Sequence, residues 1–294
     1  MVKPYEWMVK YTPQTEWISG RGLLFWLAFF FIELGAGMFI ISSIFDVLTG
    51  QMIGWLLCAL LGGGWHLLFL GRPFRFFRMV VKPQTSWISR GLIFVSLFLI
   101  LGVVQMAMSL RATPPVALLV ATNILAFLSV IYGGFAMCSV RGISLWNTPI
   151  LPIMYVVAGI LGGVELTMAV ILGSGGILEV GVTVEEVSRI LLLSFVIIIG
   201  SYLIGVRYNS TTGAKAVIEI VLGQGKVLFW VIVVIIGILL PVGVAISSFA
   251  TGLKGAPESI IWTSIFAGIV GDLMLRYLIL RYGFYAPLVP SSHI

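Results

Sequence analysis

The chain has 294 residues, of which 60% are hydrophobic and only 10% charged, and its net charge is +6 at pH 7. A soluble domain usually carries about 25% charged residues, so this composition excludes a water-soluble globular protein. We expect membrane lipid and other proteins, and not nucleic acid, to be the partners of such a chain.

Long apolar segments predict eight membrane-spanning helices. A helix needs roughly 20 mostly apolar residues to cross a hydrocarbon core of about 30 Å. Such segments lie at about 22–47, 51–71, 90–111, 116–140, 149–173, 185–207, 226–250 and 259–281, and turns that contain Gly or Pro separate them. The sequence therefore predicts an all-α integral membrane protein with a single domain over residues 1–294. Pro241 lies inside the seventh segment, where its missing N–H predicts a kink.

A short sequence is repeated before the first and third segments. Thr12-Pro-Gln-Thr-Glu-Trp17-Ile-Ser19 resembles Lys82-Pro-Gln-Thr-Ser-Trp87-Ile-Ser89. One interpretation is a reused membrane-interface motif, because Trp favours the headgroup level. The other is that both copies line one surface where a partner docks.

The basic residues are distributed unevenly between the two ends of the predicted bundle. With eight spans both termini lie on one side, which holds 14 of the 17 Lys and Arg, whereas the other side holds Arg111, Arg189 and Lys254. By the positive-inside rule the termini are cytoplasmic. A basic face can also be a docking surface for an acidic subunit, and the bias then indicates less about orientation.

Three acids inside the spans are candidates for function, because ionisable groups are costly in a membrane. Glu33 lies roughly 16 Å along the first span at 1.5 Å per residue, where it either bonds a backbone carbonyl as a neutral acid or relays protons. Asp272 and Arg276 are four residues apart, so they can form an ion pair that is structural or belongs to a proton path. Glu165 lies nearer the side away from the termini.

Small residues in the first span predict a close helix contact. Gly35-Ala-Gly37 lets another helix approach closely, and Gly62-Gly-Gly64 of the second span is the neighbour that we expect.

His66 is about one helical turn from the basic end of the second span, and Gly71-Arg-Pro-Phe-Arg-Phe-Phe-Arg78 follows it. Arginines and aromatic rings at that level can close a pocket around a flat, amphipathic ring with a hydrophobic tail. The alternative is a hydrogen-bonded structural histidine beside an ordinary snorkelling segment. Tyr132 and Gln105 are further polar groups within the spans.

Metal and haem sites are not expected. Cys58 and Cys138 lie far apart in apolar spans, which excludes iron–sulfur ligation and structural zinc. Haem held by two histidines needs a second one in the membrane, and His293 belongs to the terminal tail. A partner must therefore deliver any electrons that the protein handles.

Five stretches occur in order along nearly the whole chain. They are Gly35-Ala-Gly37, Leu70-Gly-Arg-Pro-Phe-Arg-Phe-Phe-Arg78 with Pro83-Gln-Thr-Ser-Trp87, Leu145-Trp-Asn-Thr-Pro-Ile-Leu-Pro152 with Ala158-Gly-Ile-Leu-Gly-Gly163, Leu228-Phe-Trp230 through Pro241, and Gly271-Asp-Leu-Met-Leu-Arg-Tyr277 to Gly283. Together they resemble the polysulfide reductase/NrfD family of membrane-anchor subunits, which includes anchors of the dimethyl sulfoxide reductase type.

The resemblance implies two four-helix bundles without a bound cofactor, in the plasma membrane of a prokaryote. It also implies two partners, a ferredoxin-like iron–sulfur subunit with 4Fe–4S clusters and a molybdopterin catalytic subunit. A quinone, menaquinone or ubiquinone, would react in the anchor beside the docking face.

The same resemblance implies roles for individual residues. The family's quinol-linked histidine maps onto His66, although close relatives of the sulfoxide type place it directly before Leu-Gly, and here it stands four residues before Leu70. His66 would protonate the quinone and Glu33 would relay protons. The quinone-binding candidates are His66, Arg72, Trp87 and Tyr132; the ion pair or proton path comprises Asp272, Arg276 and Glu165; the docking candidates are Arg75, Arg78, Lys82 and Trp17.

Two other functions are compatible with the sequence. A secondary transporter would use Glu33, Glu165 and Asp272 as coupling groups, with Pro241 as a helix break. A structural anchor would hold an enzyme at the membrane without binding quinone. The terminal substrate belongs to the catalytic subunit in every version of the anchor hypothesis.

Overall fold

The computed structural model describes residues 14–175, 178–251 and 257–286, so Lys3, Lys10, Lys254 and His293 lie outside the described residues. Within those ranges eight helices are long and apolar enough to cross a membrane. They are Gly22–Ile44, Leu48–Phe69, Trp87–Ser109, Val116–Cys138, Ile150–Gly173, Thr183–Asn209, Leu228–Phe249 and Glu258–Arg281. Each end lies within three residues of the end expected from the sequence. The all-α integral membrane fold with eight spanning helices is confirmed.

Most spans are single α-helices, and two change their geometry along their length. The single ones are α1 (Gly22–Ile44), α4 (Trp87–Ser109), α5 (Val116–Cys138), α6 (Ile150–Gly173), α7 (Leu178–Asn209) and α10 (Glu258–Arg281). The second span joins α2 (Leu48–Leu56), the π-helix η2 (Leu57–Gly63) and α3 (Gly64–Phe69); the seventh joins the π-helix η4 (Leu228–Leu239) and α9 (Leu240–Thr251). Three short helices, η1 (Gln14–Trp17), η3 (Pro73–Val81) and α8 (Thr211–Val221), lie between or before the spans.

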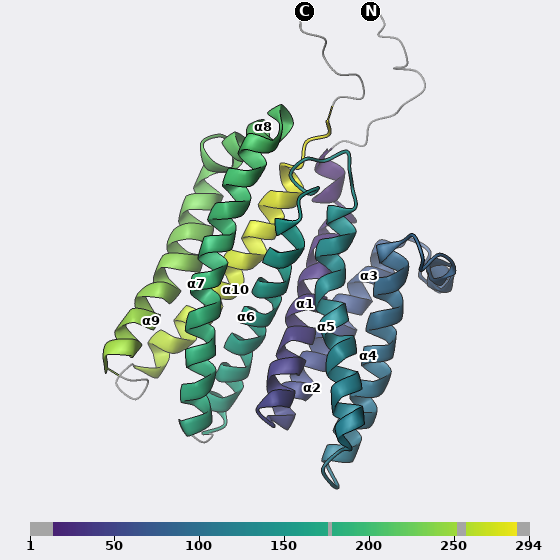
Figure 1. Cartoon of the computed structure of the whole chain (residues 1–294), viewed down its shortest axis with the longest axis vertical. Helices are drawn as coiled ribbons and strands as arrows, with labels where there is room; N and C mark the ends of the chain where they lie inside the picture. Colours follow the sequence, from purple (N-terminus) through teal and green to yellow (C-terminus); the bar gives the residue numbers. More distant parts are fainter. Residues whose placement is uncertain (1–13, 176–177, 252–256, 287–294) are drawn as a thin grey trace, which may run out of the picture.

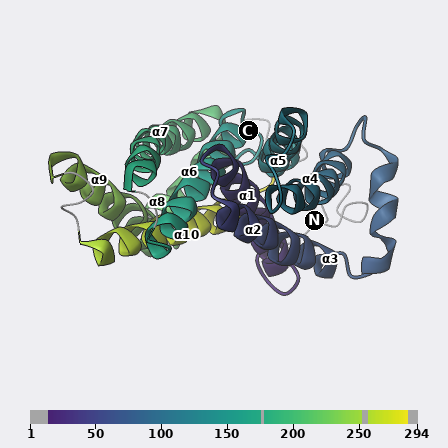
Figure 2. The ribbon, with the colours of Figure 1, turned by 90° about the horizontal axis from the view of Figure 1, so that it is seen from below.

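The spans form two groups that meet along α1 and α6. Seen along the bundle, α1 to α5 lie on one side and α6 to α10 on the other (Figure 2). In the first group α4 packs on α5, and α1 contacts α2 and α5; in the second group η4 packs on α10. The contact between the groups is that of α1 with α6. The described chain begins and ends at the upper end of the bundle in Figure 1, here called the terminal end. The opposite end, where α1 turns into α2 and α7 begins, is called the far end.

Glycines allow α1 to approach two neighbours closely. A Cβ on Gly35 would lie 2.6 Å from the backbone of Gly54 and Cys58, and one on Gly62 would meet Ile32. Gly35 does contact the second span, but at Gly54 and Cys58 and not at the expected Gly62-Gly-Gly64, and Gly37 faces Gly159 and Gly163 of α6 instead. Residues two apart on a helix do not share a face, which is why Gly35 and Gly37 contact two different helices.

The seventh span changes from π-helical to α-helical geometry at Leu240, one residue before Pro241. A proline lacks the N–H that would bond the carbonyl four residues earlier. A local π-helical adjustment in a membrane helix lets neighbouring groups satisfy the freed carbonyl. The proline therefore coincides with a change of helical type.

The two copies of the repeated segment make different contacts. Ser86 accepts a hydrogen bond from the N–H of Ser89 and caps α4, which therefore begins at Trp87, three residues earlier than expected. Trp87 stacks on Phe135 with ring centroids 4.5 Å apart, whereas Trp17 lies edge-on to Trp146 at 5.2 Å. Both tryptophans thus pack against the protein near the terminal end.

Candidate functional site

An apolar pocket of about 200 Å³ lies near the terminal end, between the second span, η3 and α4. Its walls are aliphatic and aromatic side chains together with backbone at glycines, and the side chains with polar atoms are His66, Ser96 and Tyr132. An apolar cavity with a few convergent polar groups is the usual form of a site for a small organic ligand.

His66 and Tyr132 approach each other at this pocket, although they come from different spans. His66 Nε2 lies 3.4 Å from the Tyr132 hydroxyl oxygen. The ring of Phe29 lies against both, with centroids 5.1 Å from His66 and 5.3 Å from Tyr132. His66 Nδ1 is buried and has no hydrogen-bond partner among the described residues. The pair can therefore donate to, or accept from, a polar atom of a ligand.

The pocket reaches the side of the bundle. Three of its lining residues are exposed there, namely Leu67 at 38%, Phe76 at 40% and Ile88 at 46%. Phe76 belongs to η3, which projects from the bundle beside α3 and α4 (Figures 1 and 2). The pocket therefore has exposed apolar side chains at its edge.

The structure does not bring the other two expected quinone-binding residues into this pocket. Arg72 is exposed, and Trp87 is held between Phe135 and the guanidinium of Arg90, whose Cζ is 4.6 Å from the ring centroid. The docking candidates Arg75, Arg78 and Lys82 are exposed on or next to η3, and Trp17 is half-buried.

A second constellation joins the two groups of helices. Arg276 donates through Nη1 to Glu33, and its Nε lies 3.0 Å from Asp272 Oδ2. Glu33 is fully buried and Arg276 is 3% exposed, and the ring centroid of Tyr155 lies 4.3 Å from the guanidinium carbon. The four-residue spacing on α10 does place Asp272 beside Arg276. The partner of Glu33 is this guanidinium, however, and not the backbone carbonyl considered above.

The charges of this network do not balance one to one. One guanidinium neutralises one carboxylate, and an uncompensated charge is costly inside a membrane. One of the two carboxyl groups is therefore left without a compensating positive charge in this network. Phe29 lies four residues before Glu33 on the same face of α1, and its ring contacts His66.

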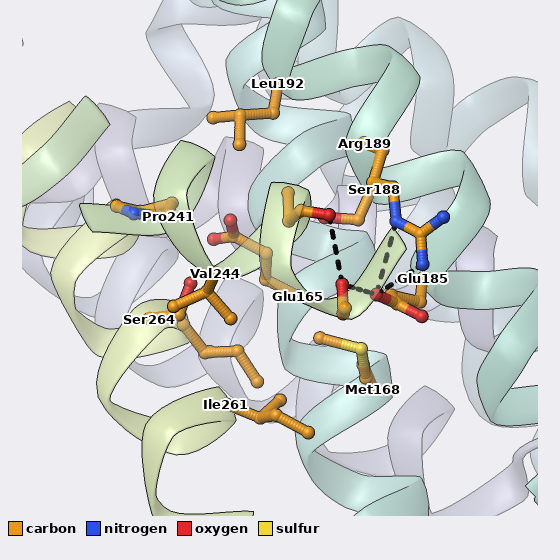
Figure 3. A pocket seen from close by; sticks show the side chains of 13 residues that line it. Glu165, Met168, Glu185, Ser188, Arg189, Leu192, Pro241, Val244, Ile261 and Ser264 are labelled. Carbon is orange, nitrogen blue, oxygen red and sulfur yellow. Dashed lines mark hydrogen bonds and ion pairs between the residues drawn. The ribbon is translucent and has the colours of Figure 1, made fainter. Parts of the chain in front are cut away.

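The third intramembrane acid, Glu165, is 4% exposed and lies beside Gly268, where a Cβ would be 3.0 Å from both carboxyl oxygens. Together with Glu185 and Arg189 it lines a small cavity at the far end (Figure 3). Glu185 was not among the candidates expected from the sequence, because it lies at the very start of the predicted span 185–207. Its four-residue spacing from Arg189 was the available signal. In the described part of the chain, no three His, Cys, Asp or Glu side chains lie together as a metal ion would require.

Comparisons with known proteins place the chain in one family. Residues 20–287 match the family model described as polysulphide reductase, NrfD. The chain is also 28% identical over 164 residues to the "Protein NrfD homolog" of Haemophilus influenzae, which is 52% of this chain and 48% of that protein. The alignment thus spans about half the length of the curated relative, whereas the family match includes all eight spans. The chain belongs to the polysulphide reductase NrfD family, a family of integral membrane subunits of multi-subunit complexes.

Proposed function

We propose that this chain is the quinone-reactive membrane anchor of an iron–sulfur/molybdopterin oxidoreductase in a prokaryotic plasma membrane. It would exchange electrons between a pool of menaquinone or ubiquinone and a docked iron–sulfur subunit. The observation that supports this function is the apolar pocket whose polar corner is formed by His66 and Tyr132 and which reaches the side of the bundle.

The chemistry of such a site follows from its residue types. Oxidation of a quinol releases two electrons and two protons, so the site needs a group that holds a proton at the quinone oxygen. Histidine does this near neutral pH, either as donor or as acceptor, and the Tyr132 hydroxyl supplies a second polar contact. Glu33 would then receive protons beside Phe29, with Asp272, Arg276 and Glu165 continuing the path.

The electrons would leave through a partner at the terminal end. Arg75, Arg78 and Lys82 are exposed near the pocket, and complementary charge both steers and orients a docking protein. With the termini in the cytoplasm, this partner would be a cytoplasmic iron–sulfur subunit carrying electrons to or from the molybdopterin subunit.

Reversing two of these charges should weaken docking. We expect the double substitution Arg75→Glu and Arg78→Glu to lower the association rate of the purified partner subunit and to abolish its dependence on salt concentration. Surface plasmon resonance at several salt concentrations measures both. Arg111→Glu, an exposed residue at the far end, is the matched control, and equal effects of the two changes would contradict the assigned docking face.

The quinone site itself is tested by His66→Ala and by Ser96→Phe in the intact complex. His66→Ala removes the proton-handling group, which typically contributes 10²–10⁴-fold to such a step, so we expect quinol-linked turnover to fall by about a hundredfold or more. Ser96→Phe fills the pocket and should abolish binding of a quinone analogue. The control is Leu97→Phe, because the Leu97 side chain is 44% exposed. It should leave both quinol-linked turnover and analogue binding unchanged.

A loss of turnover or of analogue binding is informative only if the complex still assembles, so the yield of assembled complex is measured for each variant. Unchanged quinol kinetics in His66→Ala would overturn the assignment of this histidine. Unaltered analogue binding in Ser96→Phe would overturn the pocket as the quinone site. If the wild-type complex binds no quinone analogue, the chain is a structural anchor.

A further inference from the structure

A second cavity lies at the far end, between α6, α7, α9 and α10 (Figure 3). Its volume is about 30 Å³, and its polar lining consists of Glu165, Glu185, Arg189 and three serines, Ser188, Ser248 and Ser264. A cavity holds a water molecule when it offers about 10–15 Å³ and several polar partners. This one meets both conditions, unlike the apolar packing around it.

One buried carboxyl oxygen at this cavity lacks a partner among the described residues. Glu185 Oε1 is 2.6 Å from Arg189 Nη2 and accepts a bond from the Ser248 hydroxyl, but Glu185 Oε2 is buried with no hydrogen-bond partner among the described residues. The Glu165 side chain is 4% exposed and lines the same cavity. Buried polar groups are nearly always bonded, so the unpartnered Glu185 oxygen indicates an exchangeable water or proton in the cavity.

Glu165 is shared with a neighbouring cavity that leads toward the middle of the bundle. That cavity, of about 10 Å³, is lined by Glu165, Gly268 and Asp272 among others. Asp272 is bound to Arg276, and Arg276 is bound to Glu33. Glu165 thus separates two small cavities, with Glu185 on one side and the buried ion-pair network on the other.

The first cavity is connected to the far surface by its ion pair. The Arg189 side chain is 20% exposed and that of Glu185 is 8% exposed. Glu185 lies two residues after the start of its span at Thr183, and α7 begins at the lower end of the bundle in Figure 1. The His66 pocket lies near the terminal end, so the two sites lie toward opposite ends of the bundle.

We propose that the cavity between Glu165 and Glu185 is a proton-exchange site open to the far side of the membrane, with Glu165 passing protons between it and the Asp272–Arg276–Glu33 network. The inference rests on the proposed quinone function for the source of those protons. Oxidation of one quinol gives two electrons to the docked iron–sulfur subunit and two protons to this path, and quinone reduction takes both back. Arg189 fixes the Glu185 carboxylate at the mouth, and Gly268 leaves room for the Glu165 carboxyl to turn.

Infrared spectroscopy of the full chain in lipid, without quinone, tests the site directly. The C=O stretch that disappears in Glu165→Gln identifies the protonated Glu165 carboxyl, and heavy water shifts this band when the proton exchanges. We expect rapid exchange in the wild type and loss of that rapid phase in Ser264→Leu, whose new side chain fills the cavity. Thr263→Leu, the adjacent exposed position on α10, is the matched control and should exchange like the wild type.

Unchanged exchange in Ser264→Leu would overturn the proposal, as would the absence of any Glu165 C=O band at every pH at which the chain stays folded. Binding of a quinone analogue is measured in the same samples. If the wild type binds the quinone analogue normally but the exchange test fails, the proton-exchange site is wrong and the proposed quinone function is unaffected. Absent binding in the wild type, with exchange at Glu165 intact, counts against the quinone function and not against the exchange site.

Discussion

Replacing Arg276 by Met should lower the free energy of unfolding by about 3–5 kcal/mol, the usual cost of removing one partner from a buried ion pair. The substitution leaves Glu33 and Asp272 together in the interior without a cation, and Glu33 is fully buried. An unfolding titration of the purified chain in mixed micelles measures this change. A loss of unfolding free energy below about 1 kcal/mol, typical of exposed pairs, would contradict the conclusion that Arg276 stabilises the contact between α1 and α10.

A triple variant separates charge from packing. Arg276→Met combined with Glu33→Gln and Asp272→Asn removes all three charges, and uncharged replacements of a buried ionic group are often neutral or stabilising. We therefore expect the triple variant to recover most of the lost stability. Arg281→Met is the matched control on the same helix, because Arg281 bonds the Tyr277 hydroxyl near the helix end and should cost less than about 1 kcal/mol.

Substituting Gly37 should have the second large effect. A Cβ at this position would lie inside 3.0 Å of the Gly159 backbone, so α1 and α6 must move apart. Overpacking costs about 1–3 kcal/mol in adaptable cores, and we expect Gly37→Ala to reach at least that range because backbone and not a flexible side chain is in the way. Gly37→Leu should prevent accumulation of the folded chain.

The control for Gly37 is Gly200→Ala in α7, where a Cβ would meet nothing within 4 Å. Alanine is favoured over glycine in a helix by about 0.5–1 kcal/mol, so this change should be neutral or stabilising. The same unfolding titration compares the two variants. Equal stability of Gly37→Ala and Gly200→Ala would mean that α1 and α6 do not pack as closely as described.

The spans could be predicted from the sequence because each depends on local composition. Length and hydropathy alone set their ends, and the largest departures have local causes such as the Ser86 cap that starts α4 three residues early. The Asp272–Arg276 pair was equally predictable, because four residues along a helix fix the geometry. None of these features depends on how the helices are arranged.

The tertiary partners could not be predicted in this way. Glu33 and Arg276 are 243 residues apart, and nothing in either segment indicates the other. Gly37 was assigned to the wrong helix for the same reason, since small residues show that a close contact exists and not with which helix. Tyr132 could be singled out as a polar group within a span, but its contact with His66 needed the fold.

Proximity in sequence to His66 did not identify the residues that line the pocket. Arg72 and Trp87 are near His66 along the chain, yet neither lines the pocket, because Arg72 is exposed and Trp87 stacks on Phe135. The walls instead come from residues on one face of α4, such as Ile88, Leu92 and Leu99. The sequence could not predict that these residues line the pocket, because aliphatic residues at helical spacing give the same pattern whether they face lipid, core or ligand.

The central claim is that a quinone occupies the pocket beside His66 and Tyr132, and photolabelling of the full chain tests it most directly. A photoreactive quinone analogue is bound to the purified protein in lipid, illuminated, and mapped by mass spectrometry of the resulting peptides. We expect label on Met79 and Ile88 and on neighbouring wall residues, competed by excess unlabelled quinone and lost in Ser96→Phe but not in Leu97→Phe. Label that is spread over the lipid-facing helices and resists competition, or that concentrates elsewhere in the chain, would contradict the account.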